Sequence, residues 1–175
     1  MYEPFHKLDY PSATTNSEQM KNSLPKVEKE KGAKTVCTVY QDDEFGLEVV
    51  RGAKEALKSI GMEMAEEASF KRGATDFGSQ MQKLAAAQCD FVVLGTIIRE
   101  TVGTVATARK LGFNPTFMGS SALYTDLIHK LGGPAMNGLY ATMTVQNPYT
   151  DDASQPIRFW ANKYKTKFNE DPTVF

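Results

Sequence analysis

Short apolar runs alternate with longer amphipathic stretches along most of the chain. Residues 34–40 (KTVCTVY) are apolar or β-branched at nearly every position, which is typical of a strand buried between two layers of helices. Residues 44–60 place apolar side chains at helical spacing, and Gly61 follows as a stop signal. These two segments predict one strand–helix unit.

The same alternation continues toward the C-terminus. Further strands are predicted at residues 62–70, 91–95, 116–118 and 139–145, and further helices at 76–88, 101–111, 121–131 and from 151–154 onward. The strand centres lie about 22 to 29 residues apart, the spacing expected when helical crossovers join parallel strands. The sequence therefore predicts an α/β fold of three layers, with a doubly wound, parallel, five-stranded sheet of flavodoxin-like order 2-1-3-4-5.

The N-terminal part follows this pattern less well. Residues 17–31 have a helical pattern, but Pro25 lies inside it, and proline lacks the N–H that a helix interior needs, so a kink or a break is expected there. Residues 1–14 are expected to be irregular, and a length of 175 residues fits a single domain.

Composition removes several classes of function. The chain has 20 basic and 21 acidic side chains, so it lacks the excess of basic residues with which proteins neutralise nucleic-acid phosphates. No apolar run approaches the roughly 18 residues that span a bilayer, and the first twenty residues lack the apolar core of a signal peptide.

The two cysteines, Cys37 and Cys89, have no partners at zinc-ligand spacing. Cys37 lies within the first predicted strand and Cys89 just before the third. Because the two positions stand at different heights along neighbouring strands, free thiols are expected instead of a disulfide.

Ligands of open parallel sheets bind beyond the carboxyl ends of the strands. This rule selects four loops, which are residues 41–46, 96–100, 119–124 and 146–149. Neither of the common glycine-rich phosphate-binding patterns follows a strand, which argues against a nucleotide.

Two enzyme-like readings of these loops are weak. Acids after the first strand are found in phosphoacceptor receiver domains, but the third and fifth strands lack the aspartate and lysine that such domains need. At least one of the three acids is therefore expected to cap the following helix and complement its dipole; they are Asp42, Asp43 and Glu44. A serine, an aspartate and a histidine also occur near residues 120–129, without the sharp G-x-S-x-G turn of a hydrolase nucleophile.

Three side chains in the loops remain candidates for ligand contact. Arg99 lies in the first turn of a predicted helix, where a cation opposes the helix dipole, so either a ligand carboxylate or a neighbour such as Glu100 is expected to hold it. Phe45 and Tyr124 are aromatic residues at strand ends, and they either stack on a ligand or seal the edge of the core.

Four stretches together resemble one family: GAKTVCTVYQDDEFG, FKRGATDFGSQMQKLAAAQCDFVVLGTIIRE, ARKLGFNPTFMGSS and LGGPAMNGLYAT. They are similar to the leucine/isoleucine/valine-binding family of type I periplasmic binding proteins. The matching motifs are a D-x-x-[YF]-G turn at residues 42–46, a T-D-F-x-x-x-[LM] helix at 75–81 and the approach to a ligand loop at 112–119. The resemblance covers about residues 15–172.

The resemblance implies a function and an architecture. Members of this family are substrate receptors of ABC importers, located in the periplasm, with no enzymatic chemistry and no cofactor. They close two lobes around a small ligand. Residues 1–175 resemble only the second lobe, so the first lobe and an ABC permease are the implied partners, together with an amino-acid or carboxylate ligand.

By the same resemblance, residues of three loops are the expected ligand contacts. They are Asp42, Phe45, Thr96, Ile97, Arg99, Ser120, Ser121 and Tyr124. Amino-acid binders of the family commonly place an acid where this chain has Ser120 and Ser121, so a carboxylate without an amine is an alternative ligand. A flavodoxin-like cofactor-binding or enzyme domain is the alternative reading of the same strand-end cleft.

A lobe without its companion would leave apolar surface uncovered. The expected patch comprises Phe45, Ile97, Ile98, Leu123 and Tyr124, and the strand at residues 139–145 would offer an open sheet edge. Self-association of the chain through one of these two surfaces is therefore expected.

Overall fold

The computed structural model describes residues 7–8 and 13–174. Most of the segment expected to be irregular, 1–14, lies outside these residues. The elements in chain order are α1 (Asn16–Lys31), β1 (Val36–Gln41), α2 (Glu44–Ser59), β2 (Glu66–Phe70), α3 (Gly78–Ala86), β3 (Phe91–Gly95), α4 (Ile98–Lys110), β4 (Thr116–Gly119), the short 3₁₀ helix η1 (Ser121–Leu123), α5 (Leu127–Gly132), the 3₁₀ helix η2 (Gly133–Met136), β5 (Leu139–Ala141) and α6 (Gln155–Phe168).

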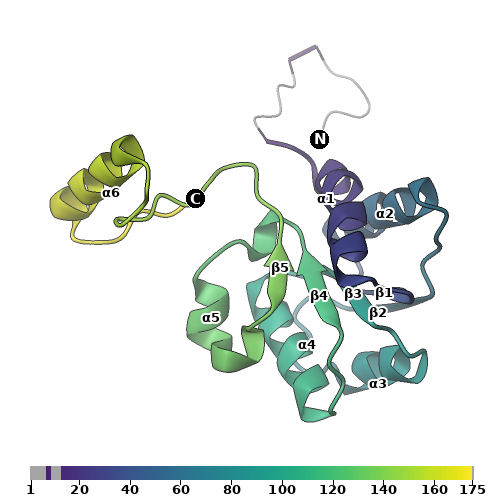
Figure 1. Ribbon diagram of the computed structural model, residues 1–175. Coiled ribbons are helices and arrows are strands. Elements are labelled where there is room, and N and C mark those ends of the chain that lie inside the picture. The colour runs from purple at the N-terminus through teal and green to yellow at the C-terminus, as the bar shows by residue number, and fades with distance from the viewer. Residues whose placement is uncertain (1–6, 9–12, 175) are drawn as a thin grey trace. The chain divides into compact units, whose positions relative to one another are not determined.

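The chain divides into two compact units, Met1–Thr142 and Met143–Phe175. The first unit contains a five-stranded sheet of order β2-β1-β3-β4-β5, in which every neighbouring pair of strands is parallel (Figure 1). The predicted fold class and strand order are confirmed.

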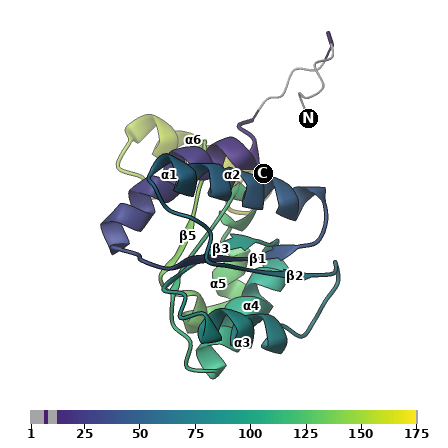
Figure 2. The same ribbon diagram turned by 90° about the vertical axis from the view of Figure 1, so that its right-hand side faces the viewer.

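Helices cover both faces of this sheet, which gives the three predicted layers. Viewed along the sheet, α1 and α2 lie on one side of it and α3, α4 and α5 on the other (Figure 2). Each face has its own apolar cluster. Met20, Leu24, Val49 and Leu57 pack on one face of the strands, and Met81, Leu84, Val105 and Ile128 pack on the other.

A kink or a break was expected at Pro25, and the break does not occur, because α1 continues through this residue. Met20 and Leu24, one turn apart on the same helix, are fully buried against the sheet and α2. Packing of this face outweighs the one helical hydrogen bond that proline cannot donate. Gly32 then ends the helix in the left-handed conformation.

Two predicted elements differ in extent or continuity from the sequence pattern. The strand predicted at 139–145 stops at Ala141, because β5 pairs only with β4, and β4 ends at Gly119. The helix predicted at 121–131 is divided into η1 and α5, because the backbone leaves helical geometry at Tyr124.

The prediction of free thiols is wrong: Cys37 and Cys89 form a disulfide, with their Cα atoms 5.9 Å apart. Height along the strands alone does not determine whether the two cysteines meet. In the structure α3 crosses the face of the sheet, and the chain turns back at Gln88, whose φ is 56°, before it enters β3. Both cysteines belong to the apolar cluster on that face, so they meet across the face.

The described residues of the second unit contain one helix, α6, which follows its N-cap Ser154 and has Pro156 in its first turn. Trp160, Tyr164 and Phe168 form a ladder of rings along it, with centroid separations of 5.6 and 4.7 Å. No helix among the described residues is both long and apolar enough to span a membrane.

Candidate functional site

Three of the four predicted ligand loops leave the sheet at its carboxyl edge in the first unit, and the fourth, residues 146–149, belongs to the second unit. Tyr40 stands beside Gly95 in the ladder, and Leu94 stands beside Gly119. The residues that follow β1, β3 and β4 therefore leave the sheet at the same edge. The segment after β5 begins earlier than expected, at Thr142, because β5 is short.

The loop after β1 is organised by two aspartates with different partners. Asp43 caps α2, since its carboxylate accepts a hydrogen bond from the Gly46 N–H at 3.1 Å and another from the Gln41 side chain. This confirms the capping interpretation. Asp42 forms an ion pair with Lys71, and this hydrogen bond raises the pKa of Lys71 above its usual value. The Asp42 carboxylate is thus already bound to a cation.

Close packing at the start of α2 leaves no room for a side chain at position 46. A Cβ atom on Gly46 would lie 2.0 Å from the carbonyl oxygen of Gln41, and one on Gly95 would lie 2.7 Å from the Cβ of Tyr40. The start of α2 therefore packs directly on the ends of β1 and β3. Phe45, beside this contact, is half-buried and packs against the α1–α2 cluster.

The loop after β3 places one polar side chain inside the protein and one outside. Thr96 is fully buried, and its hydroxyl lies 2.5 Å from that of Thr101. Ile97 precedes α4 and is half-buried. The Arg99 side chain is 72% exposed and donates a hydrogen bond to Glu100 Oε1 at 3.1 Å, so the neighbouring carboxylate expected from the sequence is present.

Glu100 is the most unusual acid of this edge. Its side chain is 1% exposed, and its Oε2 atom has no hydrogen-bond partner among the described residues. Burial of a carboxylate is unfavourable unless it is paired and hydrogen-bonded. In Glu100, the Oε1 atom accepts the hydrogen bond from the Arg99 guanidinium. Arg99 is therefore anchored by this contact and exposes the rest of its guanidinium at the edge.

The loop after β4 is tightly bonded to the protein. Ser120 is fully buried and caps η1 by accepting from the Ala122 N–H at 3.4 Å. Ser121 bonds through both its N–H and its hydroxyl to Gln19, while Tyr124 is half-buried at the end of η1. Leu123, expected in the exposed apolar patch, is instead buried at 3% exposure.

The structure adds two residues that the sequence reasoning missed, Gln19 and Thr142. Helix α1 runs opposite to the strands, so its first turn reaches the carboxyl edge although it precedes β1 in the sequence. Gln19 is 6% exposed and accepts from the Thr142 hydroxyl at 2.8 Å. The sequence signal that could have identified Gln19 was an uncharged amide next to Met20, on the apolar face of the predicted helix.

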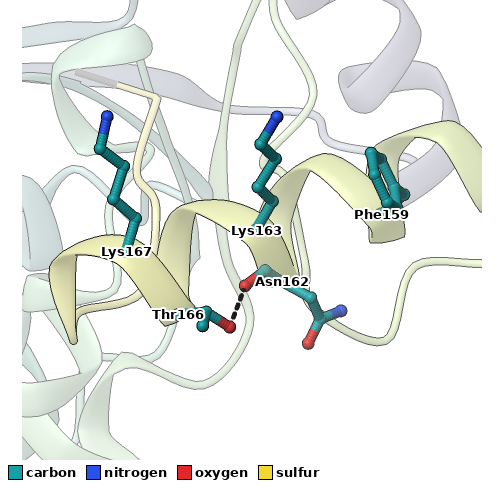
Figure 3. A pocket seen from close by; sticks show the side chains of 5 residues that line it. All are labelled: Phe159, Asn162, Lys163, Thr166 and Lys167. Carbon is teal, nitrogen blue, oxygen red and sulfur yellow. Dashed lines mark hydrogen bonds between the residues drawn. The ribbon is translucent and has the colours of Figure 1, made fainter.

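A hollow of about 430 Å³ lies elsewhere, along α6 in the second unit. Figure 3 shows Phe159, Lys163 and Lys167 projecting to one side of the helix, with Asn162 and Thr166 on another side. One helix lines the whole hollow, and none of the eight predicted site residues belongs to it. It is an open surface of the helix and does not enclose a ligand.

The described residues contain no group of three or more histidine, cysteine, aspartate or glutamate side chains that could hold a metal ion. At the carboxyl edge, the exposed polar group of the predicted set that carries a positive charge is the Arg99 guanidinium, and the half-buried apolar or aromatic side chains are Phe45, Ile97 and Tyr124. Such groups suit a small anion with an apolar part, such as a carboxylate, held by non-covalent contacts.

Comparison with known proteins gives a consistent family. The sequence pattern of a family described as periplasmic binding protein matches residues 9–175. A leucine-, isoleucine-, valine-, threonine- and alanine-binding protein of Pseudomonas aeruginosa is 24% identical over 140 residues, which are 80% of this chain and 36% of that protein.

Solved structures share the fold. A substrate-binding periplasmic protein from Ralstonia solanacearum has a TM-score of 0.83 at 20% identity, over 98% of this chain and 49% of the other. A fatty acid ABC transporter substrate-binding protein from Thermomonospora curvata has a TM-score of 0.78 at 24% identity, over 93% of this chain and 42% of the other. The chain thus spans less than half the length of these relatives.

Proposed function

The chain belongs to the periplasmic binding protein family, and we propose that it serves as the solute-binding component of an ABC importer for amino acids or related small carboxylates. The observation that carries this proposal is the agreement of the family match with the placement of three predicted loops at one sheet edge. Capture by closure around the ligand requires no covalent step.

The chain would supply one lobe of such a receptor. Relatives are more than twice as long as the matched part, which leaves room for a companion lobe that covers the carboxyl edge. The full receptor would then deliver its ligand to a permease. A periplasmic location agrees with the Cys37–Cys89 disulfide, because such bonds persist in oxidising compartments.

The ligand contacts would come from the exposed or half-buried members of the predicted set. Arg99 would attract the ligand carboxylate, and Ile97, Phe45 and Tyr124 would contact its apolar part. Asp42, Thr96 and Ser120 already have partners within the protein, so they would contribute through the shape of their loops unless ligand binding exchanges those partners.

A titration followed by NMR tests this proposal. The probes are L-leucine, benzoate as a carboxylate without an amine, and glucose as a neutral control. Half a cleft leaves the ligand open to water, so millimolar affinity is expected for the carboxylates, with shifts at Ile97, Arg99 and Tyr124. Micromolar affinity would contradict the one-lobe part, and the absence of shifts at this edge would contradict the site.

Substitution of Arg99 sharpens the titration. Arg99→Gln should weaken both carboxylate probes several-fold, because it removes the exposed cation of the edge. Arg109→Gln is the matched control, since Arg109 lies in the last turn of the same helix and donates to Asn114. Equal weakening by both variants would point to general charge in place of a specific contact.

Self-association is a further part of the proposal. Because Leu123 is buried, the first candidate surface is reduced to half-buried side chains that include Ile97 and Ile98. The second candidate surface is the edge strand β5. Sedimentation at increasing concentration should detect dimers. Replacing Ile97 and Ile98 with serine should dissociate a dimer formed through the loops and leave one formed through β5 intact.

A further inference from the structure

One side chain, Gln19, joins three segments that are far apart in the sequence. Its Nε2 donates to the Thr14 carbonyl at 2.9 Å and to the Ser121 hydroxyl at 3.1 Å. Its Oε1 accepts from the Ser121 N–H and from the Thr142 hydroxyl, both at 2.8 Å. The partners lie up to 123 residues away.

These contacts use the whole hydrogen-bonding capacity of the amide, which has two N–H donors and an oxygen that accepts two bonds. They also fix its orientation. A backbone N–H only donates, so the atom facing Ser121 N is the oxygen, and a carbonyl only accepts, so the atom facing Thr14 is the nitrogen. At 6% exposure, Gln19 leaves nothing of its amide for a ligand.

The three partners occupy distinct places in the fold. Thr14 lies just before α1, and Thr142 is the last residue of the first unit. Ser121 is the first residue of η1, in the loop after β4, which is one of the predicted ligand loops. Thr142 is also bonded to β4 through its N–H, which donates to the Gly119 carbonyl at 3.1 Å.

We propose that Gln19 is a positioning residue that holds the loop after β4 against the segment before α1 and the segment after β5. This inference rests on the proposed function, because only that function makes the loop after β4 a ligand-binding loop. The Ser121 oxygen accepts from Gln19 and keeps its own proton to donate, which suits a ligand carboxylate. Any movement of Ser121 on binding then reaches Thr142 through one shared side chain.

Amide hydrogen exchange measured by NMR on the full chain tests the positioning role. In Gln19→Met, which keeps the length of the side chain but none of its hydrogen bonds, exchange at Ser121 should accelerate about tenfold. Exchange at Val93, in the centre of the sheet, should stay unchanged. Gln19→Glu keeps an oxygen that can accept from the Ser121 N–H, although it loses the two bonds that the amide nitrogen donates, so it should restore part of the protection at Ser121.

Asn22→Met is the matched control, since Asn22 lies one turn later on α1 and is exposed. It should leave both exchange rates unchanged. The proposal is overturned if Gln19→Met leaves Ser121 unaltered, or if it accelerates Ser121 and Val93 equally, because the latter result would mean a general loss of stability.

Probe binding separates this inference from the proposed function. When L-leucine or benzoate shifts the Ser121 resonance, Thr142 should shift with it in the natural protein and stay in place in Gln19→Met. Joint shifts that persist in the variant overturn the coupling. If neither probe shifts Ser121, the ligand assignment fails, and the exchange rates still decide whether Gln19 positions the loop.

Discussion

The two ends of the sheet are held together in different ways. At the amino end, the Cys37–Cys89 disulfide joins β1 to the segment before β3, and the Asp90 carboxylate accepts from the N–H groups of Lys34 and Thr35 at 2.8 and 2.9 Å. These contacts fix the backbone directly, and they involve no residue of the predicted site.

At the carboxyl end, hydrogen bonds from side chains, and no covalent cross-link among the described residues, hold the loops. Asp43 caps α2, Ser120 caps η1, and Gln19 connects α1 with the segments after β4 and β5. Close packing at Gly46 completes this end. The comparison indicates that a covalent bond and direct backbone contacts hold the amino end, whereas side-chain hydrogen bonds and close packing hold the carboxyl end, where we propose that the ligand binds. Four predictions test this division.

Loss of the disulfide should have the largest effect. Replacing Cys37 and Cys89 together with serine releases a loop with a sequence separation of 52 residues and should lower the free energy of unfolding by about 4 kcal/mol. Urea unfolding measures the change, and reduction of the natural protein should reproduce it. Thiol titration of the denatured, unreduced protein should find no free thiol, and a count of two would refute the cross-link.

Gly46→Ala should have the next largest effect, at the opposite end. The added methyl group would meet the Gln41 carbonyl at 2.0 Å, so α2 has to shift, at a cost of about 1 to 3 kcal/mol. Unlike the loss of the disulfide, this change should also alter the resonances of Ser120 and Thr96. Leu47→Ala, at the exposed neighbouring position, serves as the control and should change little.

A matched pair of aspartates compares the two ends more finely. Asp90→Ala leaves two backbone N–H groups without their acceptor and should cost about 1 kcal/mol. Asp42→Ala removes only an exposed ion pair with Lys71 and should cost less than about 0.5 kcal/mol. Equal losses in urea unfolding would contradict the claim that the amino end is the more firmly held.

The smallest effects concern two ion pairs with opposite pH dependence. Hydrogen bonding from Lys83, at the amino end, lowers the pKa of Glu66, so its contribution is present above the ordinary carboxyl pKa of about 4.3 and is lost as pH falls further. The hydrogen bond with Asp42 raises the pKa of Lys71, so the pH dependence has the opposite sign. The contribution of this pair to stability is present at neutral pH and is lost as pH rises through the raised pKa of Lys71.

Urea midpoints as a function of pH measure both contributions. Lys83→Met should flatten the acid limb of the curve, and Lys71→Met should flatten the alkaline limb. Because all four side chains are about one third exposed or more, 0.5 M salt should reduce both effects. Changes that are insensitive to salt would mean that packing and not charge is responsible.

The sequence by itself determined the layers of the fold and its strand order. Buried parallel strands are apolar at nearly every position, as in residues 91–95, and amphipathic helices repeat their apolar side chains with another period. One helix cap was also predictable from the sequence, since Asp43, one of the three acids expected to provide a cap, caps α2. The carboxyl edge was found by a rule of topology that needs only the strand order.

Tertiary structure alone decided which distant groups meet. Cys37 and Cys89 are brought together because α3 crosses the face of the sheet, and Gln19 reaches Ser121 because α1 runs opposite to the strands. Helix α1 continues through Pro25, and β5 stops where its neighbour stops. In each case the outcome depends on contacts between segments far apart in the chain, and hydrophobic periodicity carries no information about such contacts because it is a local property.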